Sequence, residues 1–262
     1  SQRNASTQLT KLTERVDRFG HLLRSLGIQR EERILLALLD TIDWPTAFLG
    51  AVKAGVVPVP VNTLMTEDDY RFMLADSRAR LLVVSEALLP KFANLIGASP
   101  APLHVIVSGE NGQGHARFED VLAQAKGEPY TAPTTRDDIC FWLYTSGSTG
   151  KPKGAVHVHA GFLVKVASEV AYQVDLHPDE TLHWVTDLGW IMGPWEIVGA
   201  LALGATVLLT EGAPTVPRPD RLWATVEREG VNSLVIVGDA FGRPMLRGLR
   251  EGPARDVSCV QF

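Results

Sequence analysis

The sequence predicts an α/β protein in which parallel sheets are flanked by helices. Short apolar runs of strand length recur along the whole chain, and segments with helical periodicity separate them. Strands of a parallel sheet are buried on both faces, so they read as nearly continuous apolar runs. Alternation of such strands with helices is typical of parallel sheets that are covered on both sides.

The chain begins with an amphipathic helix that ends near Gly27. The apolar residues that recur with helical spacing are Leu9, Leu12, Val16, Phe19, Leu23 and Leu26. The apolar run 33–40 has the length of a buried strand. A helix is expected over 44–55, with Pro45 near its start and Gly55 at its end, where these two residues are most favoured.

The segment 56–62 is expected to be extended, because its two prolines cannot lie inside a helix. Thr66 and Asp69 have the spacing of a capping box, which predicts a helix over 67–77. The remaining expectations for this half are strands over 80–85 and 103–109 and a glycine-rich loop over 109–117.

The second half repeats the same alternation. Strands are expected over 139–144, 181–187, 205–211 and 231–238, and helices over 161–172, 194–204 and 218–230. The runs expected to form interior strands of parallel sheets are 33–40, 80–85, 139–144, 182–186, 206–209 and 233–237. The composition of 125–138 favours a division into a first α/β subdomain, 1–130, and a second, 131–262, which is incomplete at its C-terminus.

Composition narrows the class of protein. With 262 residues, 45% of them hydrophobic and 21% charged, the chain has the profile of a soluble globular protein. Its net charge of -5 gives no support for binding to nucleic acid or to a membrane. The two cysteines form no metal-ligand pattern, and the N-terminus carries no apolar signal core. We therefore expect a cytoplasmic protein that binds neither nucleic acid nor a membrane.

The stretch YTSGSTGKPKGAVHVH, Tyr144 to His159, is the strongest functional signal. It follows an expected strand, and in α/β folds ligands bind beyond the carboxyl ends of strands. Its glycines let the backbone approach an anion, its hydroxyls donate hydrogen bonds, and Lys153 supplies a positive charge. The stretch is not a Walker A loop. Thr145 stands where that loop has its first glycine, and Pro152 stands where it has a serine or threonine after the lysine.

In its order of residues, YTSGSTGKPKG resembles the signature of the acyl-adenylate-forming (AMP-binding) enzymes, which include the acyl-CoA synthetases. The stretch from Val16 to Ser85 resembles benzoate-CoA ligases, 184–212 resembles acetyl- and propionyl-CoA synthetases, and VGDAFGRPMLRGL resembles long-chain or steroid acyl-CoA synthetases. The implied fold is a partial N-terminal domain of the acyl-adenylate-forming fold. These likenesses point to different acids.

The resemblance implies a two-step ligation. A carboxylic acid and ATP form an acyl-adenylate with the help of Mg²⁺, and coenzyme A then takes the acyl group. The residues that match the family's phosphate-binding loop are Thr145, Ser146, Gly147, Ser148, Thr149, Gly150, Lys153 and Gly154, and Lys153 is the candidate catalytic cation. Such catalysis depends on positioning and on neutralising phosphate charge.

Three further residues are candidates for binding the acid: Trp190, Gly193 and His159. Trp190 belongs to a tryptophan-rich segment that either lines an acyl pocket or packs in a core. On one strand, His157 and His159 would face the same side. That pair either lines the acid site or packs, and with no third ligand in view we expect no metal site.

The family's later motifs do not occur in the sequence: a Tyr-Gly-x-Thr-Glu stretch, a Thr-Gly-Asp stretch and the hinge with its C-terminal lysine. We therefore expect the first part of a larger domain, with impaired ligation. The alternatives are a catalytically incomplete nucleotide-binding or scaffold protein and, more weakly, an ester or thioester hydrolase. Loss of covering structure would expose Val235, Ile236 and Val260, which favours a homo-oligomer.

Overall fold

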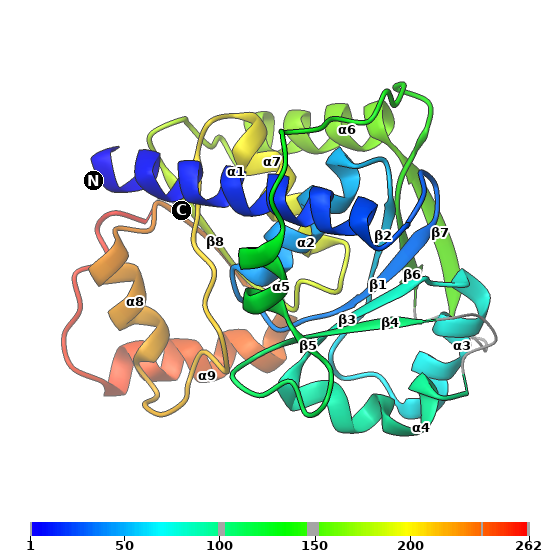
Figure 1. Cartoon of the computed structure of the whole chain (residues 1–262). Coiled ribbons are helices and arrows are strands. Elements are labelled where there is room, and N and C mark those ends of the chain that lie inside the picture. Colours follow the sequence, from blue (N-terminus) through cyan, green and yellow to red (C-terminus); the bar gives the residue numbers. More distant parts are fainter. Residues whose placement is uncertain (1, 99–102, 146–151, 237, 261–262) are drawn as a thin grey trace. The chain divides into compact units, whose positions relative to one another are not determined.

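The structure is a computed structural model that describes residues 2–98, 103–145, 152–236 and 238–260 (Figure 1). It is an α/β protein with parallel sheets and flanking helices, as the sequence predicts. The strands lie at β1 Arg33–Ala37, β2 Val57–Pro60, β3 Leu81–Ser85, β4 His104–Ser108, β5 Ala116–Arg117, β6 Ile139–Thr145, β7 Lys153–Val158, β8 Thr181–Val185, β9 Thr206–Val207 and β10 Ser233–Ile236.

The helices lie at α1 Gln2–Ser25, α2 Asp43–Lys53, α3 Glu67–Ser77, the 3₁₀-helix η1 Glu86–Phe92, α4 Ala93–Ile96, α5 Phe118–Gln124, α6 His159–Tyr172, α7 Met192–Ala202, α8 Arg221–Glu229 and α9 Gly238–Glu251. By packing, the chain forms two compact units. The first unit is Ser1–Phe162 with Leu188–Ile191, and the second unit is Leu163–Asp187 with Met192–Phe262. The predicted subdomain boundary near residue 130 stays a prediction.

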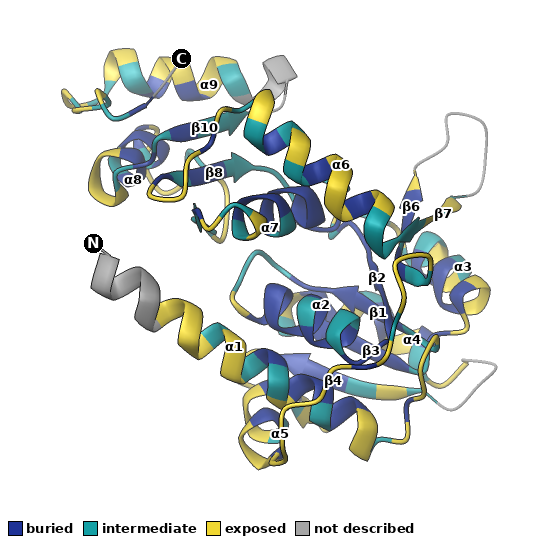
Figure 2. Ribbon diagram, turned by 90° about the horizontal axis from the view of Figure 1, so that it is seen from above, coloured by how far each residue is buried: buried dark blue, intermediate teal, exposed yellow. Residues whose placement is uncertain are grey.

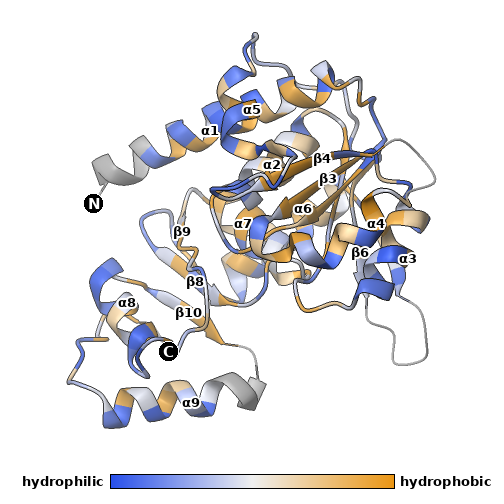
Figure 3. Cartoon of the chain, turned by 60° about the horizontal axis from the view of Figure 1, so that its bottom comes forward, coloured by the Kyte–Doolittle hydropathy of each residue, from blue (hydrophilic) through white to orange (hydrophobic). Residues whose placement is uncertain are grey.

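The first unit is built on a five-stranded parallel sheet in the order β2-β1-β3-β4-β5. Strands β1 and β3 are buried along nearly their whole length, and β3 and β4 are strongly apolar in Figure 3. Strand β2 lies at the edge, where its prolines remove no hydrogen bond from the sheet interior. The predicted interior strands 33–40 and 80–85 are thus confirmed.

Alternate residues of these strands face opposite layers of helices. Leu35 of β1 and Leu82 of β3 pack in one cluster with buried side chains of α3, η1 and α4, such as Tyr70 and Phe92. Ile34 and Leu36 are equally buried but lie outside that cluster, so they face the other side. There α2 contacts β1 and β2, and α1 packs along α2 and α5 (Figure 2).

The structure confirms the capping box of α3. Asp69 N–H donates to Thr66 Oγ1 at 3.3 Å, and Thr66 N–H donates to Asp69 Oδ2 at 3.1 Å. The four helices η1, α4, α5 and α9 have no counterpart among the predicted elements. The stretch 109–117, expected to be a loop, ends in the two-residue strand β5.

The prediction that 139–144 is an interior strand of a parallel sheet is wrong. Strand β6 pairs antiparallel with β7 in a separate two-stranded sheet. An apolar run does not reveal pairing direction, and a short connection to the next strand permits the antiparallel hairpin. The second unit contains a parallel sheet in the order β10-β8-β9, so among the described strands β8 is central, as predicted for 182–186. The prediction that 206–209 and 233–237 are interior strands is wrong, because β9 and β10 lie at the edges of that sheet.

The expected exposure of Val260 is also wrong. It is 8% exposed and packs in a cluster with Leu222, Trp223 and Met245. Val235 and Ile236 are half-buried. The segment after α9 therefore covers apolar surface of the second unit, because its backbone returns along α8 and Arg255 pairs with Asp220 at 2.6 Å.

Four residues far along the chain, Leu188–Ile191, belong to the first unit. Leu188 N–H donates to Asp40 Oδ1, just past β1, at 3.1 Å. Gly189 lies against the end of β2, where a Cβ atom would be 2.2 Å from the carbonyl oxygen of Val61. We call this four-residue segment the clip. Only glycine allows its backbone to approach so closely.

We predict that Gly189→Ala destabilises the first unit by about 1–3 kcal/mol, because the added methyl group would collide with the backbone of Val61 and Asn62. Urea unfolding followed by circular dichroism measures the change. Gly97→Ala is the matched control, since a Cβ atom there would meet nothing within 4 Å. Equal unfolding midpoints for the two variants would contradict the close packing of the clip.

Candidate functional site

The glycine-rich segment joins the two strands of the β6–β7 hairpin. Tyr144 lies opposite Gly154 and Thr145 lies opposite Lys153. Thr145, Lys153 and Gly154 are exposed at the end of the hairpin, where the Thr145 hydroxyl donates to the carbonyl oxygen of Lys153 at 3.4 Å. The predicted site residues Ser146, Gly147, Ser148, Thr149 and Gly150 lie outside the described residues.

The hairpin is held by aromatic side chains of β6. Trp142 lies under the guanidinium of Arg33, whose carbon is 5.5 Å from the ring centroid. Arg33 Nε also donates to the carbonyl oxygen of Ser77, at the end of α3, at 2.6 Å. Phe141, on the same strand, is fully buried against Phe48. The positions of Thr145 and Lys153 therefore depend on a packed base.

The electrostatics of the site differ from those of a loop that opens a helix. Strand β7 intervenes between the glycine-rich segment and α6. The N–H of His159 donates to the carbonyl oxygen of Asp138 at 3.2 Å, and that of Ala160 donates to Arg136 at 3.0 Å. A helix N-terminus attracts anions through such N–H groups. Here these two are already bonded, and Lys153 is a cation at the described end of the hairpin, opposite Thr145.

The two histidines do not share a strand face, so that expectation is wrong. His157 lies on β7, whereas His159 begins α6. The imidazole of His157 stacks on Phe141 with centroids 4.5 Å apart and meets Phe162 edge-on. Burial lowers the pKa of His157. The imidazole of His157 thus packs as one member of an aromatic cluster with Phe141 and Phe162.

His159 has a different environment. Burial lowers its pKa, and the nearby carboxylate of Asp138 opposes that effect. Its Nε2 atom is buried without a hydrogen-bond partner among the described residues. Nowhere in the part of the chain that the structure describes do three or more His, Cys, Asp or Glu side chains lie close enough together to hold a metal ion.

The tryptophan-rich segment is divided between the units. Trp184 of β8 and Trp195 of α7 meet edge-on in the second unit, with centroids 4.9 Å apart. Trp190 is half-buried in the clip of the first unit. Gly193 is buried as the second residue of α7, rather than just before that helix as expected.

Sequence reasoning missed a buried acid in this region. Glu196 is 0% exposed, and its Oε1 accepts a hydrogen bond from the N–H of Trp184 at 2.8 Å. Trp195 Nε1–H donates to Glu169 Oε2 at 2.9 Å. A single acidic residue in the otherwise apolar stretch PWEIVGALALG is the signal that could have identified Glu196.

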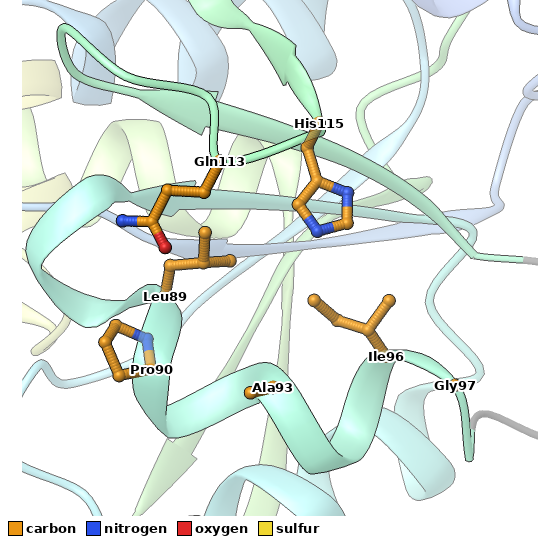
Figure 4. Close-up of a pocket in the computed structure, with 7 residues that line it drawn as sticks. All are labelled: Leu89, Pro90, Ala93, Ile96, Gly97, Gln113 and His115. Atoms are coloured by element: carbon orange, nitrogen blue, oxygen red, sulfur yellow. The ribbon is translucent and has the colours of Figure 1, made fainter.

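A separate cavity of about 330 Å³ lies in the first unit (Figure 4). Leu89, Pro90, Ala93, Ile96 and Gly97 form its apolar side, and Gln113 and His115 reach over it from the connection between β4 and β5. Of the predicted site residues that the structure describes, none lines this cavity. Helices long and apolar enough to span a bilayer are absent from the described ranges.

Comparison with known proteins gives a consistent result. The model of the AMP-binding enzyme family matches residues 4–258. The benzoate–CoA ligase of Thauera aromatica is 42% identical over 207 residues, which are 78% of this chain and 39% of that protein. The acetyl-coenzyme A synthetase of Methanothrix thermoacetophila is 31% identical over 240 residues, 85% of this chain and 36% of that protein.

A solved structure of a benzoate CoA ligase from Burkholderia xenovorans is 36% identical, with a TM-score of 0.74 over 85% of this chain and 43% of that chain. An anthranilate CoA ligase structure is 25% identical, with a TM-score of 0.84 over 95% of this chain and 48% of that chain. The chain spans about two fifths of the length of the curated relatives it matches.

We predict that His157→Phe flattens the pH dependence of stability. Because burial lowers the pKa of His157, the unfolded chain binds the proton more readily, and wild-type stability falls as the pH drops through about 6.5. Phenylalanine keeps the stacked ring and cannot titrate. Urea unfolding at about pH 7.5 and about pH 5.5 measures the free energy of unfolding at each pH. Between these two values, the variant should lose less of that free energy than wild type does. His104→Gln, at the exposed start of β4, should retain the wild-type loss.

Proposed function

The chain belongs to the AMP-binding enzyme family, and from that premise we propose that it takes part in the ATP-dependent activation of a carboxylic acid. The acid would be converted to an acyl-adenylate and then transferred to coenzyme A. The observation that carries this proposal is the family match over residues 4–258, which includes the complete glycine-rich segment. Relatives named as CoA ligases and synthetases support it.

In this proposal the glycine-rich segment binds the terminal phosphates of ATP. Thr145 would contribute a hydroxyl, Gly154 would allow close approach of the backbone, and Lys153 would neutralise charge as the catalytic cation. The residues that complete the proposed loop are Ser146, Gly147, Ser148, Thr149 and Gly150. The exposed hairpin end and the bonded N-terminus of α6 support a role for Lys153 as the main cation.

We propose Trp190, Gly193 and His159 as residues that contact the acid. The half-buried ring of Trp190 and the unpaired Nε2 of His159 support this assignment as an apolar contact and a hydrogen-bonding group. The relatives act on acids as different as benzoate and acetate by their names, so the test has to include both.

Magnesium would arrive with the nucleotide, because Mg²⁺ keeps several waters and binds largely through substrate phosphates. The described residues provide no cluster of carboxylates for an all-protein site. We also propose a reducing, cytoplasmic setting, which the free thiols of Cys140 and Cys259 support. Burial raises the pKa of Cys140 to about 12, so its thiol is inert.

The decisive experiment measures binding and chemistry separately. Calorimetry with ATP, Mg²⁺ and pyrophosphate tests the loop, and pyrophosphate release with benzoate, acetate, propionate and longer acids tests adenylation. We expect the chain to bind ATP and pyrophosphate. Turnover by these 262 residues alone should be far below the usual range of about 1–10³ s⁻¹, because the family's later motifs are absent from this sequence. Absence of both ATP and pyrophosphate binding would refute the proposal.

We predict that Lys153→Ala weakens the binding of ATP and pyrophosphate by about 10- to 150-fold. The variant removes a charge-assisted hydrogen bond, which contributes about 1.5–3 kcal/mol. Titration calorimetry measures both dissociation constants. Lys126→Ala, at an exposed position outside the hairpin, is the control that should leave them unchanged.

We also propose that the chain self-associates. Strand β10 is an edge of the described sheet of the second unit, and its Val235 and Ile236 are half-buried. An unpaired edge is a template for pairing with another chain. Size-exclusion chromatography with light scattering should give a dimer or larger species. A monomer at high micromolar concentration would count against it.

A further inference from the structure

The side chain of Tyr144 lies where the two arms of the hairpin meet the glycine-rich segment. Tyr144 immediately precedes Thr145, and its residue is only 3% exposed. Opposite it, a Cβ atom at Gly154 would lie 3.4 Å from Cε1 and 3.8 Å from Cζ of the tyrosine ring. The ring therefore packs beside the backbone that directly follows Lys153. One side chain contacts both arms.

The hydroxyl group of Tyr144 attaches this junction to α3. It donates to Asp76 Oδ2 at 2.7 Å. The ring of Phe72, one turn earlier on the same helix, meets the Tyr144 ring edge-on, with centroids 6.3 Å apart and planes at 76°. Two neighbouring turns of α3 thus hold the tyrosine, one through a hydrogen bond and one through aromatic packing.

Helix α3 is itself held firmly. Its capping box fixes the first turn. Tyr70, in the next part of the helix, is fully buried, stacks on Phe92 and donates its hydroxyl to the carbonyl oxygen of Asn62 at 2.7 Å. These contacts restrict the movement of α3, the helix that carries Asp76. A hydrogen bond to Asp76 therefore also restricts the movement of the Tyr144 side chain.

The protonation of the Tyr144 hydroxyl suits this role. Burial raises the pKa of Tyr144, and the hydrogen bond to Asp76 and the charge of its carboxylate raise it further. The phenol thus stays a hydrogen-bond donor throughout the physiological pH range.

We propose that Tyr144 and Asp76 are positioning residues, whose hydrogen bond sets the places of Thr145 and Lys153 and thereby the affinity for the terminal phosphates of a nucleotide. The inference rests on the proposed function, because it takes those phosphates as the ligand. Binding groups have to be held within about 0.5 Å of the productive geometry by packing and supporting hydrogen bonds. Among the described contacts, the hydroxyl of Tyr144 is the one that ties the residue next to Thr145 to a side chain of α3 by a hydrogen bond.

The test compares Tyr144→Phe, Asp76→Ala and the double variant by calorimetry with pyrophosphate, Mg²⁺-ATP and AMP. Each single change should weaken pyrophosphate and ATP about tenfold, while AMP, which lacks the terminal phosphates, changes less than about twofold. The double variant should lose no more than either single variant, because both changes remove one interaction. Asp68→Ala is the control, on the same helix with a side chain 93% exposed.

A merely structural role gives a different result. It would lower the unfolding temperature and weaken AMP and pyrophosphate equally, or weaken neither, and each of these outcomes overturns the inference. Additive losses in the double variant would also overturn it.

A second measurement does not need a nucleotide. Amide hydrogen exchange in β6 and β7 should speed up about tenfold in Tyr144→Phe and stay unchanged in Asp68→Ala, because the hairpin then opens more often. If wild type binds no pyrophosphate, the proposed function fails, and exchange still decides whether the pair fixes the hairpin. Unchanged exchange in both strands would refute that.

Discussion

Strands β1 and β3 are covered on both faces, so the first unit can place polar side chains on them only where the strands end. That constraint is visible at the carboxyl ends of β3 and of its neighbour β4, which end in Ser85 and Ser108. Ser85 Oγ accepts the N–H of Leu39 at 2.9 Å, and Ser108 Oγ donates to Asp43 Oδ2 at 2.7 Å. Arg15 of α1 reaches the same carboxylate at 2.5 Å. Burial raises the pKa of Asp43, while Ser108 and Arg15 oppose the rise. Polar groups at the ends of the strands thus also attach α2 to the sheet, and α1 to α2.

The hairpin that carries the glycine-rich segment is stabilised differently from the five-stranded sheet. With only two strands of its own, it gains stability from aromatic rings that pack its base, and it leaves its polar end open. A phosphate-binding loop that opens a helix gains a positive potential from the helix itself. Here the first N–H groups of α6 are bonded to the carbonyl oxygens of Asp138 and Arg136, so this helix offers neither of them to an anion.

Much of the fold could be predicted from the sequence, because runs such as 33–40 and 80–85 carry the pattern of buried strands and Thr66 with Asp69 carries that of a helix start. Pairing direction could not, since the run 139–144 has the same apolar pattern as a parallel strand. His159 was misplaced because a strand that continues into a helix leaves no breaker between them. For the site, the motif predicts a phosphate-binding role for Lys153, and this role stays a prediction. The contact of Tyr144 with Asp76 spans 68 positions, and no local pattern encodes it.

The clip, Leu188–Ile191, has a consequence for the order in which the chain acquires structure. During synthesis, the first 162 residues leave the ribosome well before the four that complete their packing. Until those four arrive, the end of β2 near Val61 lacks the backbone that will lie against it, and Asp40 lacks the N–H of Leu188. The first unit therefore reaches its final form only after residues 163–187 of the second unit have been made.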